Sequence, residues 1–366
     1  MSHPYESLPS AAFWRSAVGQ KEPRQIDGLW APKFALSQQD RVVTAGSCFA
    51  QHIGRALARA GYSWYDAEPA PRYLAEEQAR EFNYGIFSFR TGNIYTVALL
   101  NQWMSWVFGR TAQPDEVWLD DGRYYDPFRP DIEPHGFASR EELFAARKWT
   151  MQAIYNAVTT ASLFVFTLGL TEGWRNKRKG YVYPMCPGTI AGDFDASEHE
   201  FHNYQYAEIR RDLEATLDLI RSANPSIRFL LTVSPVPLTA TASSQHVLVA
   251  TTQSKSTLRA VAGDVAAAAV DTDYFPSYEI ISSFPFKGMF YEPNMRTVAR
   301  EGVEFVMRSF LDALHSETST NRTIAAVDAT GTRTAGSPAI TAPPAEDPDD
   351  DIVCEDILLE AFDRSR

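Results

Sequence analysis

Short apolar runs alternate with amphipathic stretches along most of the chain. Four of these runs have the length and composition of buried strands, and they lie at residues 40–45, 163–168, 228–233 and 269–272. Apolar residues recur at helical spacing in four other segments, at residues 49–60, 206–223, 254–269 and 298–315. Strands that alternate with helices form parallel sheets that are covered on both faces. The pattern therefore predicts an α/β protein with a parallel central sheet.

The pattern also divides the chain into regions. We expect the α/β domain to span residues 40–315. Aromatic residues scattered among prolines and glycines in residues 1–39 favour an irregular arm packed on that domain. Residues 316–351 hold few large apolar side chains, so we expect a disordered linker there. Residues 352–366 regain apolar side chains, which is typical of a short amphipathic segment that docks on the chain's own body or on a partner protein.

Composition narrows the classes of function. The 366 residues carry a net charge of −12, and nine acidic residues against two arginines in residues 345–366 account for −7 of it. An acidic chain argues against a nucleic-acid partner, which needs a basic face. No apolar stretch is long enough to span a membrane, and residues 1–19 lack the pattern of a signal peptide. Three cysteines are too few for a disulfide framework, so we expect a soluble cytoplasmic protein with reduced thiols.

The segment Gly46-Ser47-Cys48 joins the first predicted strand to the first predicted helix. A nucleophile on a sharp strand-to-helix turn is exposed at the sheet edge, where the helix N-terminus stabilises its anion. Backbone N–H groups at such a turn can face an oxyanion. The same three residues are equally consistent with a plain β–α turn in which the serine caps the helix.

The string AGSCFAQHI, from Ala45 to Ile53, resembles the GSCFA-domain family, which is named for the pentapeptide inside it. The resemblance covers roughly residues 30–310 and continues through TGNIYT, TLGLTEGW, YPMCPGT, FHN, TVSP and YFPSYEI in the expected order. The family is regarded as similar to SGNH/GDSL hydrolases and carbohydrate O-acyltransferases. The resemblance therefore implies an SGNH-like, flavodoxin-type α/β/α sandwich of three layers and acyl-transfer chemistry.

The resemblance leaves two candidate nucleophiles. In SGNH enzymes the nucleophile lies two residues after a glycine, and counting from Gly46 gives Cys48. A shift of one residue gives Ser47, which agrees with the serine of those enzymes. A helix N-terminus and a nearby imidazole activate a thiol for attack on an acyl carbon, so a cysteine suits the chemistry. The glycine spacing favours Cys48, and both residues are kept.

The catalytic base departs from the SGNH pattern. Those enzymes carry Asp-x-x-His before the last helix, whereas the matching positions here hold Asn294 and Thr297. A base would then come from another histidine. His246, on a Ser/Thr-rich loop at the predicted sheet edge, is the first choice, and His202 in the FHN motif is the second. Glu279 could orient the imidazole.

SGNH enzymes stabilise the oxyanion with a glycine N–H and an asparagine amide. Gly85 resembles that glycine, and Thr171 stands where the asparagine would lie. Another amide, from Asn93 or Asn203, would then have to serve. The full set of predicted oxyanion and substrate-binding residues is Gly46, Gly85, Asn93, Gly169, Thr171, Trp174 and Asn203.

Trp174 begins a basic loop with Arg175, Lys177, Arg178 and Lys179. Aromatic faces stack on sugar rings, and the cations suit acidic sugars or the phosphates of an acyl donor. A run of this kind can equally be a solvated loop. No close Cys/His pairs have the spacing of a metal site. We expect no metal and no cofactor, with acyl-CoA as a candidate donor substrate.

Together these features predict an SGNH-like O-acyltransferase or acetyltransferase acting on a polysaccharide or other glycan. A carbohydrate esterase of the same fold is one alternative. The missing Asp-x-x-His pair keeps open a non-catalytic module that binds a glycan or a protein partner. A scaffold that recruits partners through its acidic tail is a further alternative.

Overall fold

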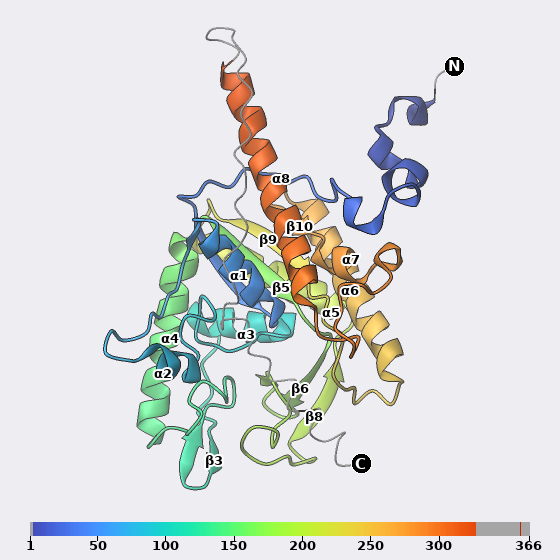
Figure 1. The fold of residues 1–366 in the computed structure, drawn as a ribbon. Coiled ribbons are helices and arrows are strands. Elements are labelled where there is room, and N and C mark those ends of the chain that lie inside the picture. The colour runs from blue at the N-terminus through green and yellow to red at the C-terminus, as the bar shows by residue number, and fades with distance from the viewer. Residues whose placement is uncertain (1–2, 327–358, 360–366) are drawn as a thin grey trace.

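The computed structural model describes residues 3–326 and residue 359 (Figure 1). Its centre is a five-stranded parallel sheet in the order β10-β9-β5-β1-β2. Counted among these five strands, this is the 2-1-3-4-5 order of flavodoxin-type sheets. The predicted α/β class with a parallel sheet is therefore confirmed. The strands are β1 Arg41–Gly46, β2 Ser63–Trp64, β5 Leu163–Leu168, β9 Arg228–Val233 and β10 Thr272–Phe275.

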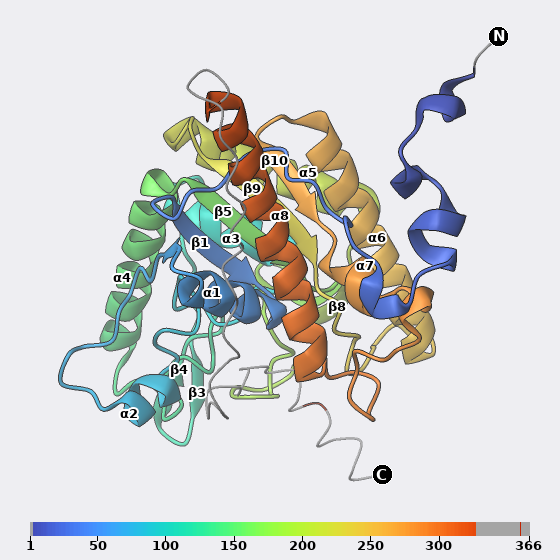
Figure 2. The ribbon, with the colours of Figure 1, turned by 45° about the horizontal axis from the view of Figure 1, so that its top comes forward.

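Helices cover both faces of this sheet because its strands are apolar on both sides. In β1, Val42 packs into one core, while Val43 and Ala45 pack into the other. The first core contains α1 Phe49–Arg59, α7 Ser277–Ser282 and α8 Arg300–Ala326, and Figure 2 shows α1 and α8 lying across the strands. The second contains α3 Val97–Val107, α4 Arg140–Thr160, α5 Tyr206–Ala223 and α6 Val247–Ala268.

A small antiparallel sheet stands beyond the carboxyl end of β5 (Figure 1). Its middle strand, β6 Glu172–Asn176, pairs with β7 Val182–Tyr183 and β8 His199–Asn203. The sequence predicts only a loop here, because these charged and aromatic residues follow no clear alternation. The hairpin of β3 Trp118–Asp120 and β4 Arg123–Tyr125 and the short helix α2 Glu76–Glu81 lie in other long connections.

Some predicted boundaries differ from the observed ones. The strand predicted at residues 269–272 lies at Thr272–Phe275, because Val270 is exposed and pairing with β9 begins at Thr272. The hydrophobic pattern of the sequence predicts neither α3 nor α4. The helix predicted to end at residue 315 continues to Ala326, so the first residues of the predicted linker are helical. The rest of that linker lies outside the described residues, as does the C-terminal segment apart from Leu359.

The N-terminal arm packs on the body mainly through its second half. Ile26 and Leu36 are buried in the core beside α8, and Trp30 stacks on Phe310 of that helix. The first half is mostly exposed and touches the body where Trp14 stacks on Phe284. The arm contains four short helical turns, η1 Pro4–Ser7, η2 Ser10–Ala12, η3 Arg15–Gly19 and η4 Pro23–Gln25. A similar turn, η5 Phe284–Phe286, follows α7. Among the helices of residues 3–326, none has the length and apolar content needed to cross a membrane.

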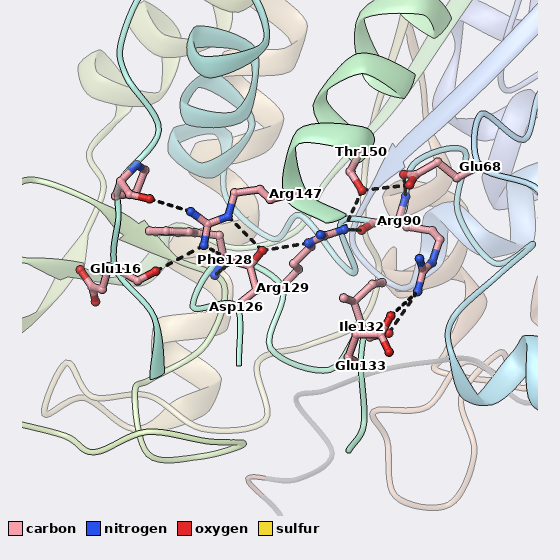
Figure 3. Close-up of polar contacts among 11 residues, drawn as sticks. Glu68, Arg90, Glu116, Asp126, Phe128, Arg129, Ile132, Glu133, Arg147 and Thr150 are labelled. Atoms are coloured by element: carbon pink, nitrogen blue, oxygen red, sulfur yellow. Dashed lines mark hydrogen bonds and ion pairs between the residues drawn. The ribbon is translucent and has the colours of Figure 1, made fainter. Parts of the chain in front are cut away.

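A buried ion-pair network holds the long connections against α4 (Figure 3). Asp126 is fully buried and accepts hydrogen bonds from Arg147 at 2.8 and 3.0 Å and from Arg129 at 2.9 Å. Burial alone would raise the pKa of Asp126, but the two guanidinium charges outweigh burial and lower it. Asp126 is therefore the shared carboxylate that neutralises two buried cations.

The network extends from this carboxylate to the segment that follows α2. Arg129 donates to Thr150 Oγ1 at 2.6 Å and to the carbonyl of Arg90 at 3.1 Å. Thr150 donates in turn to Glu68 at 2.9 Å, and Glu68 accepts from the Arg90 N–H at 3.1 Å. Arg90 directly precedes the TGNIYT motif, so the network fixes the start of that motif.

Candidate active site

β1 ends in a turn that requires glycine. Gly46 has a φ of +133°, and a Cβ there would lie 2.3 Å from the carbonyl oxygen of Thr167 on β5. The Ser47 N–H donates to that same carbonyl at 3.1 Å. The turn therefore holds Ser47 between β1 and β5. In sheets of this strand order, that is the switch point where ligands bind.

Both candidate nucleophiles are buried at the start of α1. Ser47 is 2% exposed and Cys48 is 5% exposed. Cys48 occupies the N-cap position, and no side-chain hydrogen bond caps the helix. Ser47 is therefore not the capping serine of a plain β–α turn. Its Oγ has no hydrogen-bond partner among the described residues, so both its donor and its acceptor capacity are unused.

The end of β5 lies against Ser47. A Cβ on Gly169 would lie 3.0 Å from Ser47 Cβ and 2.9 Å from the carbonyl oxygen of Tyr95. The N–H groups of Gly169 and Leu170 both donate to that oxygen, at 3.1 and 2.9 Å. Two adjacent backbone donors thus converge on one oxygen beside Ser47.

Two further predicted residues belong to the same edge of the sheet. Asn93 is 1% exposed, and the N–H of the next residue, Ile94, donates to the Gly46 carbonyl at 2.7 Å. Thr171 is also buried, and its Oγ1 has no partner among the described residues. The structure therefore brings Gly46, Asn93, Gly169 and Thr171 to the neighbourhood of the turn.

Sequence reasoning missed the residues of α6 that support this segment. Lys255 is 1% exposed, and its ammonium donates to the Gly169 carbonyl at 2.7 Å. The neighbouring Ser254 accepts from the Thr171 N–H at 3.0 Å. A polar Ser-Lys-Ser run in the middle of a predicted helix is a weak signal, because such residues usually face solvent. A buried cation at this place stabilises negative charge that develops nearby.

The predicted base and its orienting carboxylate bind other groups. His246 is exposed and caps α6, where its Nδ1 accepts from a backbone N–H at 3.2 Å. His202 lies on β8 and pairs with Glu208 of α5 at 3.0 Å. Glu279 binds the guanidinium of Arg259. The structure does not pair His246 with Glu279, and neither histidine is hydrogen-bonded to Ser47.

The remaining predicted residues lie at three separate places. Gly85 forms an exposed turn with a φ of +70°, and nothing lies within 4 Å of a Cβ built there. Trp174 is half-buried on β6, and its ring packs edge-on against Phe201 with centroids 5.9 Å apart. Asn203 ends β8 opposite Glu172. Trp174 and Asn203 thus belong to the small sheet that stands over the end of β5.

A cavity of about 270 Å³ opens between this small sheet and the loop after β9. Its lining includes Leu170, which follows the Gly169 that lies against Ser47, but neither Ser47 nor Cys48. Most of its walls are apolar, and they include Leu170, Trp174, Met185, Phe201, Leu238 and Leu359. Leu359 is the one described residue of the predicted C-terminal segment, and it lies at this cavity.

Two ionisable groups also line this cavity. Burial raises the pKa of Glu172, which is 8% exposed and accepts a hydrogen bond from Thr241 at 2.8 Å. Burial also raises the pKa of the Cys186 thiol to about 11, so this cysteine remains protonated near neutrality. Glu172 was not among the predicted site residues. The available signal was a carboxyl in TLGLTEGW just past the end of a buried strand.

No three histidine, cysteine or acidic side chains within the described part of the chain cluster as metal ligands. Comparison with protein families matches residues 41–310 to the GSCFA family. No curated protein and no solved structure matches the chain. The matched span starts at β1, contains the Ser47–Cys48 turn and ends within α8. Because that span covers well over half of the sequence, the protein belongs to the GSCFA family.

Proposed function

We propose that this GSCFA-family protein is an acyl-transfer enzyme that places an acyl group, such as acetyl, on a hydroxyl of a polysaccharide or other glycan. The observation that carries the proposal is the buried Oγ of Ser47, which has no partner among the described residues. Buried hydroxyls are normally hydrogen-bonded, and exceptions occur at reactive sites. This one lies on a glycine turn at the switch point of the sheet, beside two converging backbone donors.

The nucleophile, Ser47 Oγ or Cys48 Sγ, attacks the carbonyl carbon of the acyl donor. A base removes the proton of the nucleophile and returns it to the leaving group of the donor. The sugar hydroxyl then attacks the acyl-enzyme, and the nucleophile regains its proton. In each step the negative carbonyl oxygen needs N–H donors, and the Gly169 and Leu170 amides supply them when that oxygen replaces the Tyr95 carbonyl.

We assign the proton transfer to Glu172 in place of the histidines expected from the sequence. Glu172 lines this cavity, whereas neither His246 nor His202 lines it. Its raised pKa brings the carboxyl nearer to neutrality, where a general base is most effective. Thr241 holds one of its oxygens in place.

The cavity walls suit the two substrates. Leu170 and Leu238 offer apolar surface to an acyl chain, and the face of Trp174 offers a stacking surface to a sugar ring. We expect the protein to work in the cytoplasm. That location favours transfer onto a growing polysaccharide over hydrolysis of scavenged esters.

An acyl adduct should form on the Ser47–Cys48 turn. Incubation with p-nitrophenyl acetate or acetyl-CoA should add one acetyl group to the peptide that contains both residues, and fragment masses should identify which residue carries it. Replacing the acylated residue, as Ser47→Ala or Cys48→Ala, should slow acylation by about 10³-fold or more. Ser222→Ala, which removes an exposed hydroxyl near the end of α5, is the matched control. Absence of any adduct would contradict the proposal. If the adduct is hydrolysed but never transferred to an oligosaccharide, the protein is a carbohydrate esterase and not an acyltransferase.

Glu172→Gln should slow formation of that adduct about 100-fold, because a general base contributes about 10² or more. In the unchanged protein the rate should rise with pH as Glu172 loses its proton, above the ordinary carboxyl range because its pKa is raised. The variant should lose this rise. Stopped-flow release of p-nitrophenol over a pH series measures both effects. Glu77→Gln on α2, an exposed carboxyl, is the control, and equal pH profiles for the two variants would exclude Glu172 as the base.

One observation favours a non-catalytic binding module as the second candidate. In the segment that matches Asp-x-x-His, the two residues at the positions of the Asp and the His bond each other. The Asn294 amide donates to Thr297 Oγ1 at 2.9 Å. Asn294 also accepts from the backbone N–H groups of Arg296 and Thr297. A module of this kind would bind a glycan in the same cavity and would form no acyl adduct.

A further inference from the structure

A second cavity lies on the other side of the small sheet and shares none of the residues that line the first. Its volume is about 640 Å³, and it is bordered by α3, α5 and the turn between β6 and β7. Five basic side chains line it: Arg175, Lys177, Arg178, Lys179 and Arg211. This concentration of cations differs from the acidic balance of the whole chain.

Two of the three carboxylates that line this cavity are paired with its arginines. Glu200 pairs with Arg175 at 2.6 Å, and Asp212 pairs with Arg211 at 2.8 Å. The third carboxylate, Glu208, pairs with His202 at 3.0 Å. Arg178, a further basic residue of the lining, pairs with Glu198 at 2.6 Å, which leaves the two lysines, Lys177 and Lys179.

Neither of the two lysines that line this cavity has a carboxylate partner in the described part of the chain. Lys177 donates to the backbone carbonyl of Ala196, and Lys179 lies 5.8 Å from the ring centre of Tyr181. Neither contact cancels a positive charge. The cavity therefore carries two uncompensated ammonium groups within two residues of each other along the chain.

An independent feature of the same cavity is the hydroxyl of Tyr204. This residue is 7% exposed and lines the cavity, yet its hydroxyl has no hydrogen-bond partner among the described residues. Burial raises the pKa of Tyr204, so the phenol keeps its proton and acts as a donor. A buried donor without an acceptor is costly, and a ligand oxygen would relieve that cost.

We propose that this cavity binds the diphosphate group of a small-molecule ligand, with Lys177 and Lys179 neutralising its charge and the Tyr204 hydroxyl donating to one of its oxygens. A diphosphate matches two ammonium groups that lie close together, whereas a single carboxylate would leave one of them uncompensated. Nucleoside diphosphates and coenzyme A both contain this group. The inference goes beyond the acyl-transfer proposal, because it concerns a different cavity and holds whether or not Ser47 or Cys48 reacts.

Calorimetric titration of the full chain with pyrophosphate, ADP and coenzyme A tests this proposal. All three should bind, and the affinity should fall as salt is raised, because the attraction is electrostatic. The tightest of the three identifies the source of the diphosphate. The double variant Lys177→Gln/Lys179→Gln should weaken pyrophosphate binding about thirtyfold, and Tyr204→Phe should weaken it about tenfold. Lys148→Gln, which removes an exposed lysine on α4, should bind like the unchanged chain.

Three results would overturn the proposal. They are no binding of pyrophosphate, unchanged pyrophosphate affinity in the double lysine variant, and equal affinity for glucuronate. Circular dichroism checks that each variant is folded, and Tyr204→Phe provides the test if the lysine variant is not. The titration uses no acyl donor ester, so its failure would leave the acyl-adduct experiment untouched, and a missing adduct would leave this proposal untouched.

Discussion

Asp126→Asn should destabilise the folded protein by about 3–5 kcal/mol, because it leaves two buried guanidinium groups without their counter-charge. Asp126, Arg129 and Arg147 have no exposed side-chain surface, so water cannot replace the lost carboxylate. Denaturant unfolding followed by circular dichroism gives the free energy of unfolding. Asp193→Asn, which changes an exposed carboxylate, is the matched control and should change it by less than about 0.5 kcal/mol.

The same substitution should change how stability depends on pH. The pKa of Asp126 is lower in the folded protein than its ordinary value of 3.8. Its contribution is therefore fully present above about pH 4 and is lost as pH falls through the folded pKa. Asp126→Asn should remove this part of the acid sensitivity, which Asp193→Asn should retain. If Asp126→Asn lowers the free energy of unfolding by less than about 1 kcal/mol at neutral pH, the network shown in Figure 3 does not stabilise the packing of the long connections on α4.

Gly46→Ala should cost more than about 3 kcal/mol, or prevent folding, because two penalties combine at this position. An alanine is strained at a φ of +133°, and its Cβ would lie 2.3 Å from the Thr167 oxygen and 2.7 Å from the Thr167 nitrogen. These are backbone atoms of a buried strand, so they cannot move aside without separating β1 from β5. Soluble yield and thermal unfolding measure the effect.

Gly109→Ala separates the two penalties. Gly109 also has a positive φ, +65°, but nothing lies within 4 Å of a Cβ built there. It should cost only the backbone strain of about 1–2 kcal/mol. Equal losses for the two variants would show that the contact between Gly46 and β5 contributes nothing to stability.

The sequence predicted the elements whose hydrophobic period is strong and local. β1, β5, β9 and α5 lie within one residue of their predicted bounds, because each has an uninterrupted apolar run or a clear apolar face. α4 was missed because its core-facing side includes Arg147 and Thr150, which are polar residue types that usually face solvent. Their burial depends on hydrogen bonds and ion pairs with residues distant in the sequence. Its Ser139–Glu142 capping pair was the signal available.

The candidate site was predictable only in part. The Ser47–Cys48 turn and Gly169 could be placed near each other, because the carboxyl ends of parallel strands share one edge of the sheet. Lys255 could not be placed there, because a lysine in a helix gives no local sign that its ammonium will reach a carbonyl of a distant strand. Glu172 and the small sheet around it were missed for a similar reason, since their burial arises from contacts between segments far apart in the sequence.

The Tyr95 carbonyl has a consequence for how a substrate would enter. That oxygen occupies the position where the Gly169 and Leu170 amides converge. In the resting protein it therefore competes with a substrate carbonyl oxygen for these two donors. An incoming carbonyl must displace it, and breaking two hydrogen bonds costs about 1–3 kcal/mol. Only a ligand whose remaining contacts recover this free energy shifts the population to the open arrangement. Acyl donors that fill the cavity should therefore react faster than p-nitrophenyl acetate, and selectivity would arise from the opening step as well as from the chemistry.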